Sequence, residues 1–210
     1  MTGRRLTVLC AAWGLVLILG FAWMEAFEAT PGERGKGAEV WPRDSRLSLN
    51  ADRLTLVMVL HPWCACSRAS VGELERFVAR HQSQLAIHFV MTHPDPGLNS
   101  PEADSDRSSL RALTRRIPGA FCHEDPQGVE TGKFGARTSG ETFVYAPEGQ
   151  LLFHGGMTSR RGQMGPSPGL DALERLVAEK PSGTIVTTVF GCCLPSSTDS
   201  QETPVKKAIP

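Results

Sequence analysis

The sequence predicts an α/β domain, with a central mixed sheet flanked by helices, behind one apolar N-terminal helix. Two apolar, β-prone runs at 54–60 and 85–91 enclose a segment with helical periodicity, which indicates a β-α-β unit. Two further β-prone segments, joined by the turn Ala146-Pro-Glu-Gly-Gln, indicate a hairpin within 141–154. An uncharged apolar run at 6–23 predicts the N-terminal helix.

Composition excludes some classes of protein. The chain has 210 residues, of which 22 are basic and 22 acidic, and 40% are hydrophobic, as in an ordinary globular domain with appendages. Its formal net charge of zero argues against a nucleic-acid binder, because phosphate contacts normally require a basic excess. We therefore expect no nucleic-acid partner.

Charges flank the apolar run at 6–23. Arg4 and Arg5 precede it, and Glu25 follows it. About eighteen helical residues nearly cross a ~30 Å hydrocarbon core, and basic residues stay on the cytoplasmic side. We therefore expect residues 1–5 in the cytoplasm and the domain on the periplasmic or other extracytoplasmic side of a single-pass membrane anchor.

A cleaved signal peptide is the alternative for this segment. The run is long for a signal sequence, and Ala26-Phe-Glu-Ala29 lacks a small-x-small cleavage pattern, which favours the anchor. Both alternatives export the domain.

The remainder of the chain divides by composition. Gly, Pro and charged residues without periodicity predict a linker at 24–46, and polar residues predict a disordered tail at 196–210. The folded domain is expected at 47–195. After the first two strands we expect a surface loop at 94–109, a helix at 110–117, a strand at 120–122 and a helix at 129–134. The hairpin and a Gly-rich loop at 155–169 follow. The final helix is expected to carry Leu170, Leu173, Leu176 and Val177 on one face.

Two cysteines stand where a reactive thiol is expected. An exported domain meets an oxidising compartment, so its cysteines are interpreted first as disulfide or redox groups. Cys64, Cys66 and the preceding Trp63 come directly after the strand at 54–60 and at the start of a helix. Free backbone N–H groups and the helix dipole stabilise a thiolate there.

The segment 61–67 resembles the thioredoxin-like superfamily, especially its membrane-anchored TlpA and ResA type. That type has a strand, then Trp-Cys-x-x-Cys-Arg, then an amphipathic helix, and Trp63, Cys64 and Arg68 fall on this frame. Ser67 occupies the slot of the second motif cysteine, and Cys66 stands one residue earlier. The resemblance implies a thioredoxin-like fold and a thiol-disulfide oxidoreductase activity.

Four stretches together are most similar to the bacterial thioredoxin-like proteins labelled RedB. They are 61–67, 134–140, 155–169 and 189–192. Residues Gln163, Pro166 and Ser167 replace polar residues of that family's Gly-rich loop, so no role is carried over to it. Thioredoxins place a cis-proline opposite the active cysteine, and the resemblance puts Ser139 and Gly140 in that slot.

A disulfide between Cys64 and Cys66 would close a tight ring across one residue and depart from relaxed geometry. Such a bond is easily reduced, which favours an oxidant or isomerase over a strong reductant. The alternative is a structural pair of cysteines bonded elsewhere.

The other candidate residues keep more than one interpretation. Cys192 and Cys193 are adjacent and seldom bond each other, so one of them could pair with Cys122 or resolve Cys64. Cys122 by itself is most simply a buried core thiol. His61 either supports the thiolate or ends a strand as an ordinary polar residue.

Three functions are weighed. The leading one is thiol-disulfide exchange with protein thiols or disulfides in the extracytoplasmic space, which needs no cofactor beyond a redox-active disulfide. The second is a metallochaperone that binds Cu(I), or copper more generally, through Cys64, Cys66 and His154, since soft thiolates suit Cu(I). The third is a redox-silent interaction domain with its cysteines held in structural bonds.

Overall fold

The computed structural model describes residues 2–81, 84–92, 101–178 and 183–194. It divides into two compact units, residues 1–30 and 31–210, which are described separately. The polar tail expected at 196–210 and the start of the loop expected at 94–109 lie outside the described residues.

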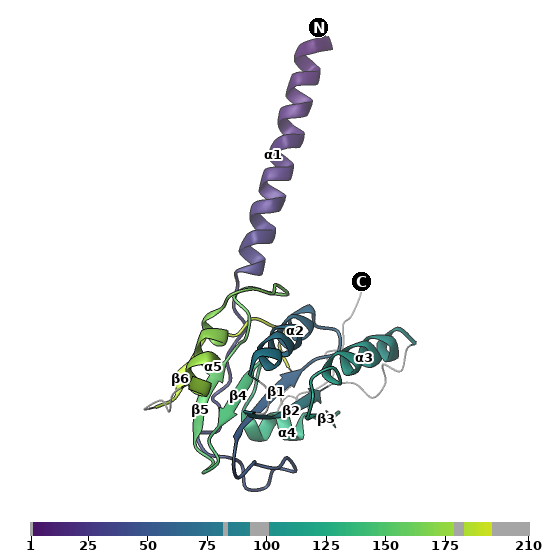
Figure 1. Cartoon of the computed structure of the whole chain (residues 1–210). Coiled ribbons are helices and arrows are strands. Elements are labelled where there is room, and N and C mark those ends of the chain that lie inside the picture. Colours follow the sequence, from purple (N-terminus) through teal and green to yellow (C-terminus); the bar gives the residue numbers. More distant parts are fainter. Residues whose placement is uncertain (1, 82–83, 93–100, 179–182, 195–210) are drawn as a thin grey trace. The chain divides into compact units, whose positions relative to one another are not determined.

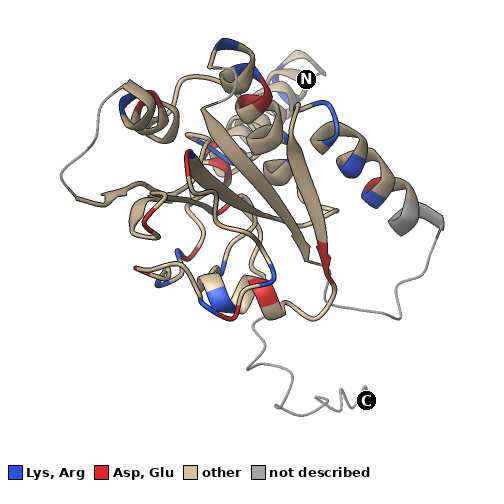
Figure 2. Cartoon of the chain, turned by 60° about the horizontal axis from the view of Figure 1, so that its bottom comes forward, with Lys and Arg blue, Asp and Glu red and all other residues tan. Residues whose placement is uncertain are grey.

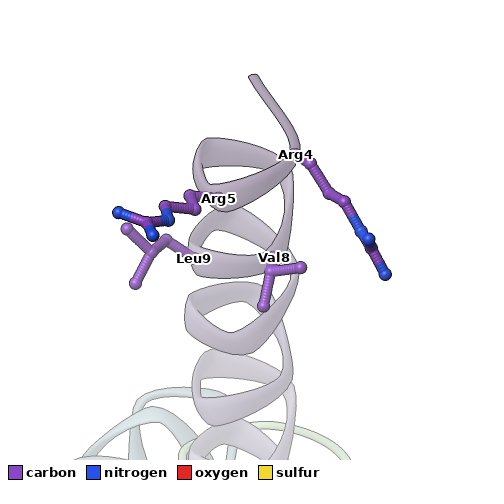
Figure 3. A pocket seen from close by; sticks show the side chains of 4 residues that line it. All are labelled: Arg4, Arg5, Val8 and Leu9. Carbon is purple, nitrogen blue, oxygen red and sulfur yellow. The ribbon is translucent and has the colours of Figure 1, made fainter. Parts of the chain in front are cut away.

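The first unit is the single helix α1 (Thr2–Glu28). Its segment Gly3–Glu28 has a mean hydropathy of 2.2 and is long and apolar enough to cross a membrane. Figure 3 shows Arg4 and Arg5 on its first turns, with their side chains directed away from the helix axis above Val8 and Leu9. Length and composition suit either a membrane anchor or a signal sequence.

The second unit is built on a six-stranded sheet in the order β3-β2-β1-β4-β5-β6 (Figure 1). Strand β1 pairs in parallel with β2, which pairs in parallel with β3, whereas β4 is antiparallel to both β1 and β5. The short β6 closes the far edge in parallel with β5. The strands are β1 (Leu54–Leu60), β2 (Leu85–Thr92), β3 (Ala120–Asp125), β4 (Thr142–Tyr145), β5 (Leu151–Gly155) and β6 (Ile185–Val186).

Helices cover both faces of this sheet. The helices are α2 (Ala65–Arg80), α3 (Pro101–Thr114), α4 (Val129–Phe134) and α5 (Pro168–Ala178). One face of β1, through Leu56, Met58 and Leu60, packs with apolar residues of α2, α3 and α5 into the larger core. The other face, through Val57 and Val59, packs with α4 and the segments around Trp41 and Leu194. Strand β1 is therefore buried on both sides, which explains its unbroken apolar run.

Most charged residues lie away from the central strands, although Glu73, Asp125, Glu130 and Glu141 are buried. Figure 2 shows Lys, Arg, Asp and Glu on the helices and connecting loops of the second unit, while the central strands are almost free of them. Basic and acidic groups are interspersed, in agreement with the net charge of zero.

The predicted α/β organisation is confirmed, with two corrections. The loop expected at 94–109 is wrong in its second half, because α3 begins at Pro101, and proline is well suited to the first position of a helix. The two-residue β6 was not predicted, since so short a strand has no periodicity to detect.

Residues 31–46, which the sequence places in a linker, contribute to the second unit. The N–H of Gly32 donates to the carbonyl oxygen of Val189 (2.9 Å), and Val40 forms a β-bridge with Gln150.

Candidate active site

The candidate site lies at the junction of β1 and α2. Residue Cys64 is the N-cap of α2, with extended backbone angles, and its N–H donates to the carbonyl oxygen of His61 (3.1 Å). Its position beside the first helical turn exposes its sulfur to free N–H groups and to the positive end of the helix dipole. The side chain is only 1% exposed, so this sulfur is enclosed by the protein.

The neighbours of Cys64 in sequence stabilise the turn that presents it. Ser67, which replaces the expected second cysteine, is fully buried, and its Oγ accepts a hydrogen bond from the N–H of His61 (2.9 Å). The rings of His61 and Trp63 make an edge-to-face contact at 5.2 Å. The hydrogen bond between His61 and Ser67 therefore joins the two ends of the turn.

The loop at 137–141 lies against this turn. Gly140 adopts a positive φ of 83° and donates its N–H to the carbonyl oxygen of Val59 (2.7 Å), and Val59 donates its own N–H to the carbonyl oxygen of Glu141 (2.9 Å). These bonds tie the loop to the end of β1 and bring Ser139 to the candidate site. The Oγ–H of Ser139 donates to the sulfur of Cys64 at 3.0 Å.

A fully buried carboxylate, Glu141, fixes the conformation of that loop. One of its oxygens accepts hydrogen bonds from the N–H groups of Arg137 (2.8 Å) and Thr138 (3.1 Å). The other accepts from the N–H of Gly35 (2.8 Å) and lies 2.6 Å from Nε2 of His154. Four donors from three segments of the chain thus converge on one side chain.

The segment at 189–194 forms another wall of the site. The N–H of Cys192 donates to Oγ of Ser139 (2.9 Å), and the N–H of Ser139 donates to the carbonyl oxygen of Cys192 (2.8 Å). The approach is so close that a Cβ on Gly191 would lie 1.9 Å from the carbonyl oxygen of Ser139. Glycine at 191 is therefore required for this segment to reach the loop.

The Gly-rich loop at 156–167 covers the first turns of α2. The backbone of Gly162 lies against the first turn of α2, where a Cβ on it would be 3.4 Å from the Cβ of Ala65. The N–H of Gly165 donates to the buried carboxylate of Glu73 on α2 (2.6 Å). Arg161 extends from the same loop and donates to the carbonyl oxygen of Gly191 (2.7 Å). This loop therefore joins α2 to the segment that carries Cys192.

The three thiols differ in their tendency to ionise. Hydrogen bonding from the thiol of Cys66, followed by bonds from Ser139 and Cys192, outweighs burial and lowers the pKa of Cys64 to about 4. The bond to Cys64 and burial raise the pKa of Cys66. Burial and the same negative sulfur raise the pKa of Cys192 to about 11, while Arg161 opposes the rise.

This arrangement places one thiolate beside a hydroxyl donor and two thiols of raised pKa. At neutral pH Cys64 is ionised, and Cys66 and Cys192, whose pKa values are raised, keep their protons. A thiolate is the nucleophile and the good leaving group in disulfide exchange. The site thus has the electrostatic requirements of that chemistry.

The structure brings only some of the predicted residues together. Cys64, Cys66, Ser67, Ser139, Gly140 and Cys192 meet as described. Cys193 is exposed and pairs through a β-bridge with Thr138, and Cys122 packs from β3 against the larger core, where burial raises its pKa. Cys122 therefore does not meet Cys192, and its interpretation as a core thiol fits its packing.

The residues of the copper alternative do not gather. His154 stacks on Phe143 (4.7 Å between ring centres) and bonds to Glu141. Within the described residues, no three His, Cys, Asp or Glu side chains form a group suited to a metal ion. His154 therefore has a structural partner and does not join Cys64 and Cys66.

Sequence reasoning missed several contacts. Glu141 was assigned only to the hairpin, and nothing in its local sequence marks it as a buried acceptor. His88 on β2 and His123 on β3, which carry no metal-ligand spacing in the sequence, are diagonal neighbours on adjacent strands with 3.0 Å between their ring nitrogens. Burial lowers the pKa of both.

Comparisons with known proteins concern the fold. No protein-family model and no curated protein matches the sequence. An uncharacterized conserved protein from Geobacillus kaustophilus aligns with 79% of this chain and 91% of its own, at 13% identity and a TM-score of 0.55. A hypothetical protein from Sinorhizobium meliloti 1021 aligns with 78% of this chain and 93% of its own, at 18% identity and a TM-score of 0.53.

The pneumococcal exposed lipoprotein thioredoxin Etrx1, from Streptococcus pneumoniae, is less similar. It aligns with 68% of this chain and 98% of its own, at 19% identity and a TM-score of 0.45. In this chain, a β-α-β unit with the cysteine pair between β1 and α2 is followed by an antiparallel hairpin and a last helix. The fold is thioredoxin-like. In this structure Ser139, which the resemblance places in the slot of the thioredoxin cis-proline, contacts the sulfur of Cys64.

Replacing Ser139 tests the ionisation of Cys64. In Ser139→Ala the sulfur loses an O–H donor that favours its charged form, so the pKa of Cys64 should rise and its thiolate fraction near pH 5 should fall. The measurement is a pH titration of thiolate ultraviolet absorbance, with Cys64→Ser identifying the signal. Ser45→Ala, which removes a hydroxyl bonded to Glu130, should leave the titration unchanged. An unchanged titration in Ser139→Ala would show that this hydroxyl does not stabilise the thiolate.

Proposed function

We propose that the protein is a thiol-disulfide oxidoreductase of the RedB type, acting on protein thiols or disulfides outside the cytoplasm. The observation that carries the proposal is the lowered pKa of Cys64 at the N-terminus of α2, among hydroxyl and thiol donors. The thioredoxin-like fold and the match of 61–67 and 134–140 to the RedB pattern support it.

In the proposed reaction the Cys64 thiolate attacks one sulfur of a partner disulfide. The partner's S–S bond breaks, its second sulfur leaves as a thiolate, and a mixed disulfide with Cys64 forms. Cys66 then loses its proton and attacks the Cys64 sulfur, which releases the reduced partner. The partner gains two electrons, and the two cysteines of the protein lose them.

The reverse direction uses the same residues. In the oxidised protein, a disulfide at Cys64 would be cleaved by a partner thiolate with Cys64 as the leaving group, because a thiol of low pKa leaves readily. A strained bond between Cys64 and Cys66 would favour this oxidising direction.

Membrane attachment through α1 completes the proposal. Arg4 and Arg5 at the start of an apolar helix predict a cytoplasmic N-terminus and an exported second unit. Such a protein would meet its partners in the periplasm or its equivalent, where disulfides persist.

A fusion experiment tests this topology. A reporter that is active only in the cytoplasm, fused after Pro210, should stay silent, and a reporter active only after export should give signal. Replacing Arg4 and Arg5 by Glu should reduce the bias between the two reporters, because the basic pair determines the orientation. Strong activity of the cytoplasmic reporter on the unmodified chain would contradict the proposal.

Two cysteine variants test the exchange reaction. With the full chain in detergent and a disulfide-bonded peptide as substrate, Cys64→Ser should abolish exchange. Cys66→Ser should retain the first attack but release the mixed disulfide more slowly than the unmodified protein, because one resolving thiol is lost. Cys10→Ser, in the apolar helix, is the control and should exchange like the unmodified protein. Equal exchange by Cys64→Ser and the unmodified protein would refute the assignment of Cys64 as nucleophile.

A further inference from the structure

The three thiols of the site differ sharply in access. The side chains of Cys64 and Cys66 are 1% and 4% exposed, whereas Cys192 is an exposed residue. A partner protein that approaches from solvent therefore meets Cys192 before it can reach either cysteine of the Cys-x-Cys motif.

The exposed thiol is nevertheless part of the site. Ser139 accepts a hydrogen bond from the N–H of Cys192 and donates one to the sulfur of Cys64, so a single hydroxyl joins the two residues. The thiol of Cys192 also lowers the pKa of Cys64, and the charge of Cys64 in turn raises the pKa of Cys192. The Cys64 sulfur and the backbone of Cys192 thus lie on the same hydroxyl, at 3.0 and 2.9 Å, in the reduced protein.

Backbone contacts hold Cys192 beside the loop that carries Ser139. Paired hydrogen bonds between Ser139 and Cys192, the bond from Leu194 to Arg137 (2.8 Å) and the glycine at 191 hold the segment 189–194 on the loop. Cys193, the next residue, instead directs its sulfur toward the carbonyl oxygen of Leu194 (3.6 Å). Only one of the two adjacent cysteines therefore meets Cys64.

We propose that Cys64 and Cys192 form a redox-active disulfide, in which the exposed sulfur of Cys192 is the atom that partner thiolates attack. The inference rests on the proposed exchange function and adds a third cysteine to it. Cys192 becomes the point of contact with partners, and Cys64 becomes the enclosed sulfur that stores and releases the electron pair.

A partner that carries two thiols supplies the two electrons that reduce the disulfide between Cys64 and Cys192. A partner thiolate attacks the Cys192 sulfur, the bond between Cys192 and Cys64 breaks, and its electron pair leaves on Cys64 as a thiolate. The partner's second thiolate attacks the partner's own sulfur in the mixed disulfide and releases Cys192, which takes a proton from solvent. The partner loses two electrons and forms its disulfide, while the protein gains both.

Ionisation supports this direction of attack. Of the two sulfurs in the bond, Cys64 has the much lower thiol pKa and is the better leaving group. In the opposite reaction, engagement of Cys64 in a mixed disulfide removes the negative charge that raises the pKa of Cys192. Arg161 and Ser139, which lower that pKa, remain to help Cys192 ionise and resolve the mixed disulfide.

Cys192 also avoids the geometric problem of the Cys-x-Cys pair. A bond between Cys64 and Cys66 must close across one residue at the start of a helix, which departs from relaxed disulfide geometry. Cys192 comes from a separate segment and has no such short ring to close.

Peptide mapping of the oxidised protein tests the inference. The full chain in detergent is oxidised with glutathione disulfide, its remaining thiols are alkylated, and disulfide-linked peptides are identified by mass spectrometry. Cys66→Ser should still give the link between Cys64 and Cys192. Cys193→Ser, which changes the adjacent exposed thiol, should give it to the same extent as the unmodified protein. Loss of the link in Cys66→Ser, with glutathione retained on Cys64, would overturn the inference.

A second readout separates this inference from the proposed function. The double variant Cys66→Ser, Cys192→Ser should retain the mixed disulfide on Cys64 far longer than Cys66→Ser alone. If both variants release it equally slowly while the unmodified protein exchanges normally, Cys192 has no role and the proposed function stands. If glutathione never modifies Cys64 in any of these chains, the proposed function itself fails.

Discussion

The site depends on the buried carboxylate of Glu141. A fully enclosed carboxylate is costly unless its oxygens are saturated with donors, and Glu141 receives them from Gly35, from the loop at 137–141 and from His154 on β5. Removing one member of such a cluster typically costs about 3–5 kcal/mol, because the others are left without their partner. The carboxylate therefore acts as a fixed point to which three separate segments are tied.

The consequence for chemistry passes through Ser139. The loop that Glu141 holds supplies the hydroxyl of Ser139, which contacts both Cys64 and Cys192. In thioredoxins a proline occupies the corresponding wall, whereas this protein presents an O–H donor to the reactive sulfur. A donor at this point favours the thiolate, and the absence of a side chain at Gly191 lets the segment at 189–194 approach it.

How far the sequence predicts this structure depends on how local each feature is. The strands β1 and β2 and the position of Cys64 follow from apolar runs and from a cysteine at the junction of a strand and a helix, which are signals within a few residues. Ser139 could be placed only through family resemblance. The role of Cys192 depends on a close approach permitted by Gly191, between segments about fifty residues apart, and no periodicity records such a contact.

Contacts between distant segments are equally absent from the local sequence. His154 was named as a copper ligand because it lies on the hairpin, and its bond to Glu141 could not be predicted from neighbouring residues. Helix α3 was expected to be a loop because its first turns are polar and begin with proline, although proline is favourable at that position. Both cases required information about distant packing or about the exact start of a helix.

The most direct test is the titration of the Cys64 thiolate in Glu141→Gln. Glu130→Gln is the control, because Glu130 is also buried but bonds to Ser45 and Lys133 instead. Thiolate absorbance is measured against pH under conditions where urea unfolding confirms that each variant is folded. If Glu141 positions Ser139, the pKa of Cys64 should rise in Glu141→Gln and stay the same in Glu130→Gln. A folded Glu141→Gln protein whose Cys64 titrates as in the unmodified chain would contradict the account.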